Sequence, residues 1–291
     1  YASNFLYKNL LDEFLDENPE INSLIIVKEE EFNQIPFSVL ITSNDNESAK
    51  WLFESVNLYY ISHFEELNQR PKENYINNFY GFGDPEPKFG FPRLQESEKE
   101  LVELGKGFSV LKNTNIFLGE SSSIENLKDL NLANSALAFS THAIRPSDSN
   151  SIQEPALLLD TWLSSGDIAF NYKFNPALVI LSACDTAWSS EKDRKPILDL
   201  PTAFRIGGAK LVLASNWKIQ DKQTMQIMNQ ASEFIYSNRG IKNLISESLR
   251  YSKIKYIREN EGKFFSSNFG KISRSHPYFW GPFDIIGLPD S

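Results

Sequence analysis

The sequence predicts an α/β fold in which helices cover a mostly parallel central sheet. Between Asn22 and Gly119, short β-branched or aromatic runs alternate with helical segments. Nearly continuous apolar runs follow at Ser135–Ser140, Ala177–Ala183 and Lys210–Ser215, as expected of strands whose two faces are both covered. The length of 291 residues suits one large domain, and a composition of 41% hydrophobic and 23% charged residues is typical of a folded chain.

The first part of the chain contains five predicted strands, at Ser23–Val27, Phe37–Thr42, Leu58–Ser62, Asn78–Phe82 and Asn115–Gly119. The segment Gly83–Pro87 is rich in turn-forming residues and is expected to end the fourth strand. Between the last two strands, apolar residues at helical spacing predict a helix that packs on the sheet: Leu101, Leu104, Phe108 and Leu111. Ser122, followed three residues later by Glu125, resembles a capping box and predicts a short helix at Ile124–Leu130.

The second part of the chain predicts a βαβ unit and two long helices. A helix at Leu198–Ile206, ended by the flexible Gly207-Gly208 pair, connects two of the apolar strands. Asp221 is a candidate cap for the next helix, which ends near Gly240. Apolar stripes mark this helix and the following one: Met225, Met228, Ala231 and Ile235, then Ile241, Leu244, Ile245 and Leu249. The polar stretch Glu259–Ser275 is interpreted as a loop.

Charge and cysteine content narrow the functional classes. With 38 acidic and 29 basic residues, the formal net charge is −9, which repels nucleic-acid phosphates and anionic lipids. The longest apolar runs are far shorter than the ~20 residues of a membrane-spanning helix. A single cysteine forms no internal disulfide, and no leader segment is recognisable. We therefore expect a cytoplasmic protein without direct nucleic-acid or membrane binding. Because Tyr1 stands where Met is usual, we also expect a fragment of a longer chain.

Two of the apolar strands are followed by reactive side chains. His142 follows Ser135–Ser140, and Cys184 follows the strand predicted at Ala177–Ala183. In a parallel sheet, ligands bind beyond the carboxyl ends of the strands. If these strands are neighbours, their spacing of ~4.8 Å brings imidazole and thiol within reach of one another.

Such a pair suits nucleophilic catalysis. A free thiol has a pKa of ~8.5 and is mostly protonated at neutral pH, whereas the thiolate is the attacking species, so a neighbouring imidazole is needed to take the proton. The backbone amides of Ala143 and Cys184 are candidate oxyanion donors, each worth roughly 3 kcal/mol. A lone cysteine is more often a small apolar core residue. The matching position of His142 favours the catalytic interpretation.

Other kinds of site are poorly supported. The glycines near Gly81–Pro85 lack the GxxxxGK[ST] order of a phosphate-binding loop. One cysteine and three scattered histidines give no ligand pair at metal spacing. We expect neither a metal nor an organic cofactor.

Several segments, in order along the chain, resemble the CHAT domain, a caspase-like family of clan CD cysteine peptidases related to caspases, separases and gingipains. The segments that carry the resemblance are Phe139–Ala143, Leu181–Ala187, Thr202–Phe204, Gly208–Trp217, Asp221 with Thr224, His276–Trp280 and Phe283–Gly287. Weaker matches include Ile35–Phe37, Gly83–Pro85 and Glu96–Leu104. Three departures stand out: Ala143 where many members have Gly, Asn216 where Leu is more usual, and Leu200-Pro201 before the helix.

The resemblance implies a three-layer αβα sandwich and a cysteine endopeptidase with His142 as base and Cys184 as nucleophile. It implies a single peptidase domain over residues 1–291, with an N-terminal pseudo-half at 1–115 and a C-terminal half carrying the dyad at 116–291. By analogy with caspase-type enzymes, Ser215, Asn216 and Trp217 would contact an extended protein substrate.

Further implications concern specificity and regulation. Asp185 and Asp221 could line a pocket for a basic side chain, although Asp221 could instead cap its helix, Asp185 could bond its own loop and Trp217 could pack in the core. Family members are often controlled by a partner or by a fused TPR or sensor module, and some act in bacterial immunity. The alternative function is a catalytically silent domain that serves as a protein-binding platform.

Overall fold

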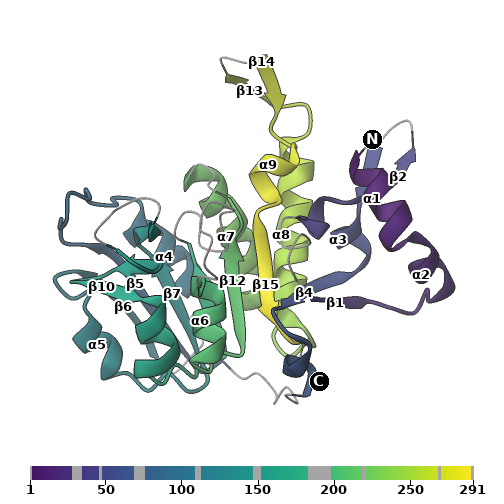
Figure 1. Ribbon diagram of the computed structural model, residues 1–291. Coiled ribbons are helices and arrows are strands. Elements are labelled where there is room, and N and C mark those ends of the chain that lie inside the picture. Colours follow the sequence, from purple (N-terminus) through teal and green to yellow (C-terminus); the bar gives the residue numbers. More distant parts are fainter. Residues whose placement is uncertain are drawn as a thin grey trace.

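A mostly parallel sheet forms the centre of the protein (Figure 1). The computed structural model describes residues 2–27, 35–45, 48–68, 76–108, 113–146, 152–182, 198–217, 221–267 and 270–289. Within these residues the sheet has eight strands, in the spatial order β1 (Ser23–Val27), β4 (Asn57–Ile61), β15 (Phe283–Gly287), β12 (Leu211–Ser215), β11 (Leu178–Leu181), β7 (Ser135–Ser140), β5 (Asn78–Pro85) and β6 (Asn113–Gly119). Only β15 and β12 are antiparallel neighbours among these described strands.

Helices and small sheets complete the described part of the chain. The α-helices are α1 (Ala2–Leu10), α2 (Asp12–Glu17), α3 (Leu52–Ser55), α4 (Ser97–Gly107), α5 (Ile124–Lys128), α6 (Leu200–Ile206), α7 (Asp221–Ser237), α8 (Leu244–Asn260) and α9 (Pro277–Trp280). Tighter or wider helical turns are η2 (Phe37–Val39), η3 (Phe64–Asn68) and η5 (Asp167–Asn171). The small antiparallel sheets pair β2 (Ile41–Asp45) with β3 (Ser48–Trp51), β13 (Phe264–Ser267) with β14 (Gly270–Ser273), and β8 (Ala143–Ile144) with β9 (Ala156–Leu158) and β10 (Trp162–Ser164).

The two faces of the sheet are covered by different helices. Side chains alternate between faces along a strand, and in β7 Ala138 contributes to the cluster that contains residues of α4, α7 and α8. Its neighbours Leu137 and Phe139 contribute to the cluster that contains residues of α5 and α6. The predicted α/β class and three-layer αβα sandwich with a mostly parallel sheet are confirmed. The expected division after residue 115 falls within β6, and strands from both parts belong to this one sheet.

The predicted βαβ unit is present as β11, α6 and β12. Asp199 caps α6, because its carboxylate accepts a hydrogen bond of 2.7 Å from the amide of Thr202. Gly207 closes the helix, and Gly208 takes φ +112°, a conformation that glycine adopts without strain. The chain thereby enters β12 parallel to β11, which fixes the central strands on which the candidate site depends.

Three expectations for the first part of the chain need correction. Phe37–Val39 is a turn of 3-10 helix, in which Val39 bonds back to the carbonyl of Pro36, so the strand starts only at Ile41. β5 continues through the expected turn to Pro85, because β6 pairs with it that far. The cap of α5 is Ser123, whose hydroxyl accepts from Asn126, and not Ser122.

The second part differs from expectation in two further places. α7 is described from Asp221 to Ser237, and because residues 218–220 lie outside the described residues, the capping role of Asp221 stays a prediction. Ile241 precedes α8, because Asn243 takes the left-handed conformation before the helix starts. The segment interpreted as a loop contains the β13–β14 hairpin, which extends away from the sheet (Figure 1). Phe265 of this hairpin contacts Phe279 with ring centroids 6.3 Å apart.

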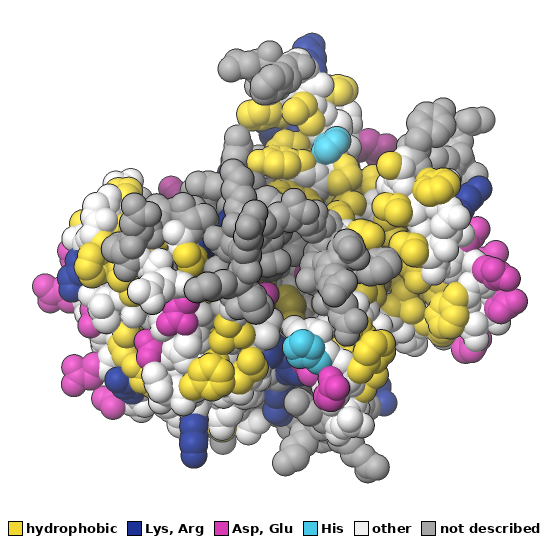
Figure 2. All heavy atoms as spheres, in the orientation of Figure 1, with side chains coloured by type: hydrophobic (Ala, Val, Ile, Leu, Met, Phe, Trp, Pro, Cys, Tyr) yellow, Lys and Arg dark blue, Asp and Glu magenta, His cyan; other side chains and the backbone are white. Residues whose placement is uncertain are grey.

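The N-terminal helices α1 and α2 were not apparent from the sequence pattern, and they expose several apolar side chains, those of Phe5, Leu10 and Phe14. Figure 2 shows apolar side chains gathered over this part of the molecule, at the right of the view. In the part of the chain that the structure describes, no helix combines the length and apolar character needed to cross a membrane.

The contact of α4 with α7 gives a first prediction. A Cβ added at Gly107 would lie 2.8 Å from Cα and 2.7 Å from the carbonyl oxygen of Ser232, so we expect Gly107→Ala to lower the free energy of unfolding by about 1–3 kcal/mol. Gly105→Ala is the matched control, because the atoms nearest to its Cβ would be side-chain atoms at 3.4–3.5 Å, and alanine favours the helix. Urea unfolding monitored by circular dichroism measures both; equal destabilisation would contradict the packing argument.

Candidate active site

β7 and β11 are neighbouring parallel strands, so their carboxyl ends lie at one edge of the sheet. β7 and β11 pair directly, with Phe139 opposite Leu181. Each residue of β7 therefore faces a residue 42 positions later in the chain, which is also the separation of His142 and Cys184 in the sequence. The amide of Ser182 continues the ladder by donating to the carbonyl of Phe139 over 2.9 Å. Cys184 and Asp185 lie outside the described residues.

His142 is held by the loop between β5 and α4. Its Nε2 lies 2.8 Å from the carbonyl oxygen of Pro92. A carbonyl only accepts, so Nε2 carries the hydrogen and donates it, which leaves Nδ1 as the acceptor of the neutral ring. Phe91 packs on the imidazole with ring centroids 4.9 Å apart. The ring is therefore fixed in orientation and tautomer, as a general base requires.

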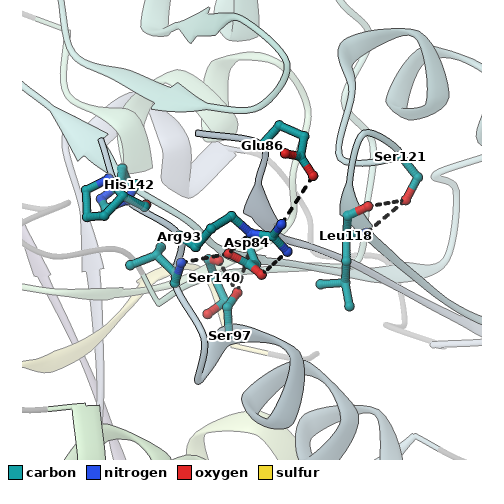
Figure 3. A network of polar contacts seen from close by, with 10 residues as sticks. Asp84, Glu86, Arg93, Ser97, Leu118, Ser121, Ser140 and His142 are labelled. Atoms are coloured by element: carbon teal, nitrogen blue, oxygen red, sulfur yellow. Dashed lines mark hydrogen bonds and ion pairs between the residues drawn. The ribbon is translucent and has the colours of Figure 1, made fainter. Parts of the chain in front are cut away.

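An ion pair anchors the same loop to the end of β5 (Figure 3). Arg93 donates from Nε and Nη2 to the two carboxylate oxygens of Asp84, at 2.8 and 2.5 Å, and from Nη1 to Glu86 at 3.2 Å. The Arg93 guanidinium holds the pKa of the Asp84 carboxyl below its usual range; the Leu94 amide acts in the same direction, and burial opposes both. Asp84 is thus charged at neutral pH.

Glu100 on α4 joins the ends of β7 and β11. Its carboxylate accepts a 2.6 Å hydrogen bond from the hydroxyl of Ser140 and a second, short one from the hydroxyl of Ser182. One turn earlier on α4, Ser97 donates to the carbonyl of Ser140 and accepts from the amide of Asp84. One face of α4 therefore binds the carboxyl ends of β5, β7 and β11 together.

Ala143 starts β8 immediately after His142 and pairs with Leu157 of β9. Its φ is not positive, so alanine introduces no backbone strain at this position. The role of its amide as an oxyanion donor stays a prediction.

The expected substrate-binding segment follows β12. Ser215 is buried and pairs with Phe283 of β15. The side chain of Asn216 donates to Asp284 over 2.7 Å. Trp217 packs against the hydrophobic core and donates from Nε1 to the carbonyl of Tyr278 over 2.9 Å. On one side, β12 is therefore already paired with β15. The expected substrate contacts of Ser215, Asn216, Trp217 and Asp221 stay predictions.

Sequence reasoning did not assign a role to Glu100, Pro92 or Arg93. Glu100 directly precedes Leu101 of the predicted apolar stripe, so a carboxylate at the border of a buried helix face was the available signal. The contact from Pro92 uses a backbone carbonyl, which has no signature in the sequence. Among the described residues, no three His, Cys, Asp or Glu side chains gather as they would around a metal ion.

The fold resembles that of solved cysteine proteinases. The chain is 11% identical to the Arg-specific cysteine proteinase gingipain R, with a TM-score of 0.59, covering 99% of this chain and 67% of gingipain R. A complex of the pro- and mature domains of RgpB from Porphyromonas gingivalis matches with 10% identity and a TM-score of 0.59, covering 99% and 68%. The Saccharomyces cerevisiae separase–securin complex matches with 13% identity and a TM-score of 0.54, covering 82% of this chain and 14% of that one.

At these identities the likeness establishes the fold alone. No curated protein matches the chain. The CHAT domain family, however, matches residues 2–288, which is nearly the whole sequence and includes every element of the central sheet. The chain is therefore a member of the CHAT domain family and has the fold of caspase-like cysteine peptidases.

Proposed function

We propose that the protein is a cysteine endopeptidase that cuts a protein substrate with Cys184 as nucleophile and His142 as general base. The observation that carries this proposal is the register of β7 and β11 together with the orientation of His142. If the register continued beyond Leu181, Cys184 would stand opposite His142, because both pairs are 42 positions apart in the sequence. The proteinases with a similar fold support the same chemistry.

The proposed reaction uses both nitrogens of His142. Nδ1 takes the proton of the Cys184 thiol while Nε2 stays hydrogen-bonded to the carbonyl oxygen of Pro92. The thiolate attacks the scissile carbonyl, and the amides of Ala143 and Cys184 stabilise the oxyanion. Collapse breaks the C–N bond, and the imidazolium returns its proton to the leaving amine. Water, deprotonated by the same ring, then releases the second product from the acyl-enzyme.

The biological setting belongs to the same proposal. A site at the ends of strands, beside the half-buried His142, suits an extended polypeptide, so we infer a protein substrate, and the net charge of −9 disfavours nucleic acid. We place the activity in the cytoplasm, as a regulated effector controlled by a partner or a fused TPR or sensor module, with bacterial defence as its proposed context. Asp185 and Asp221 remain candidates for selecting a basic side chain.

The dyad is tested by substitution. We expect Cys184→Ala to abolish cleavage and His142→Ala to slow it about 10²- to 10⁴-fold, because the thiol then lacks its base. The protein and each variant are incubated with candidate substrates, namely the proteins encoded by the neighbouring genes, and the products are identified by mass spectrometry. Labelling of Cys184 by a peptidyl acyloxymethyl ketone should depend on His142 to a similar degree.

The control is the His142→Ala variant, which keeps the Cys184 thiol but lacks the proposed base. Labelling at the wild-type rate in that variant would mean that Cys184 is merely exposed. If no product depends on Cys184 and partner capture survives both substitutions, the domain is a silent binding platform.

The bridge from α4 gives a separate prediction. Because Glu100 joins the strand ends that precede His142 and Cys184, we expect Glu100→Ala to lower kcat about 30- to 100-fold with little change in KM. Glu100→Gln keeps an acceptor and a donor for the two hydroxyls, so we expect it to restore most of the activity.

Glu98→Ala, an exposed position on the same helix, is the matched control and should leave kcat unchanged. The double variant Glu100→Ala/His142→Ala tests whether Glu100 acts by positioning the dyad. If the kcat of the double variant equals the product of the two separate losses, Glu100 does not act through the dyad.

A further inference from the structure

A row of aromatic side chains extends outward from His142. Phe91 lies against the imidazole, with ring centroids 4.9 Å apart. Trp162 of β10 meets Phe91 edge to face at 5.5 Å and stacks on Phe89 at 5.5 Å. Phe89, Phe91 and Trp162, here called the aromatic row, thus form one continuous surface that begins at the candidate general base.

Phe89 occupies an unusual position for a large side chain. It has φ +56°, the left-handed region that glycine adopts easily and bulky residues rarely do. Its side chain nevertheless remains 60% exposed, so burial does not explain why an aromatic residue stands there. Strained backbone conformations of this kind concentrate at ligand-binding sites.

The loop that carries Phe89 and Phe91 is fixed on both sides. Lys88 donates from Nζ to the carbonyl of Asp160 over 2.9 Å, next to β10. On the other side, Arg93 is bonded to Asp84 and Glu86. Both flanking cations are therefore engaged within the protein, and the surface between them is apolar and held in place before any ligand arrives.

The continuity with His142 indicates what binds there. Consecutive residues of an extended peptide are ~3.3 Å apart, so side chains close to the bond that is cut reach a surface beginning at the imidazole. Aromatic rings contribute large apolar area and prefer stacked or edge-to-face contacts with other rings. Resting on the proposed peptidase function, we propose that the aromatic row binds an aromatic or long aliphatic side chain of the substrate, within three residues of the cleaved bond.

Cleavage of a peptide library tests this directly. Peptides derived from a whole proteome are digested with the wild type, Cys184→Ala, Phe89→Gly and Trp162→Ala, and the cut sites are read by mass spectrometry. We expect Cys184-dependent cuts to be enriched at least fivefold in Phe, Tyr, Trp, Leu or Met at one position within three residues of the bond. Phe89→Gly and Trp162→Ala should each reduce that enrichment more than threefold.

Phe89→Gly separates binding from folding. Glycine adopts φ +56° without strain, so the variant should unfold at the wild-type temperature or higher while its KM for an apolar peptide rises. Phe170→Ala is the control, since Phe170 is 74% exposed and lies outside the aromatic row. It should leave the enrichment unchanged.

The possible results are distinct. Cys184-dependent cuts without apolar enrichment, or with enrichment that Phe89→Gly and Trp162→Ala preserve, would overturn the role of the aromatic row and leave the peptidase proposal intact. A lower unfolding temperature of Phe89→Gly with an unchanged KM would assign Phe89 to folding only. Absence of any Cys184-dependent cut would overturn both proposals.

Discussion

The parallel pairing of β7 with β11 is the constraint on which the rest of the site depends. Both strands are almost wholly apolar because helices cover both faces, so each has one stable place in the middle of the sheet. Their backbone ladder then decides which residues lie opposite one another. A shift by one residue would move every side chain to the other face of the sheet, so burial on both faces and the ladder together determine where each strand end lies.

The polar side of α4 complements that apolar pairing. Ser97 and Glu100 are one turn apart on the helix and bind groups at the ends of three adjacent strands. The same helix buries Leu101 and Leu104 against the sheet, so apolar packing and these hydrogen bonds together fix its position. Charged acceptors make stronger hydrogen bonds than neutral ones, which suits a bridge that has to hold strand ends together.

The loop between β5 and α4 serves two purposes at once. Its backbone orients His142 through Pro92, and its side chains form part of the aromatic row. The strained conformation of Phe89 is maintained because contacts of Lys88 and Arg93 hold the loop on either side. The orientation of His142 and the apolar surface beside it therefore depend on the same short segment.

The sequence by itself determined the α/β class, the central apolar strands and the place of His142 directly after one of them, because periodicity and strand-end placement are local properties of the chain. The hairpin β13–β14 escaped prediction because its residues are mostly polar, and η2 was mistaken for a strand because a tight helical turn after Pro36 uses equally apolar residues. Only the tertiary structure decided that β7 and β11 are neighbours, that Glu100 joins their ends and that Pro92 orients His142. Each of these contacts joins residues about 40 or more positions apart, and such pairings arise from packing of the whole sheet rather than from any local pattern.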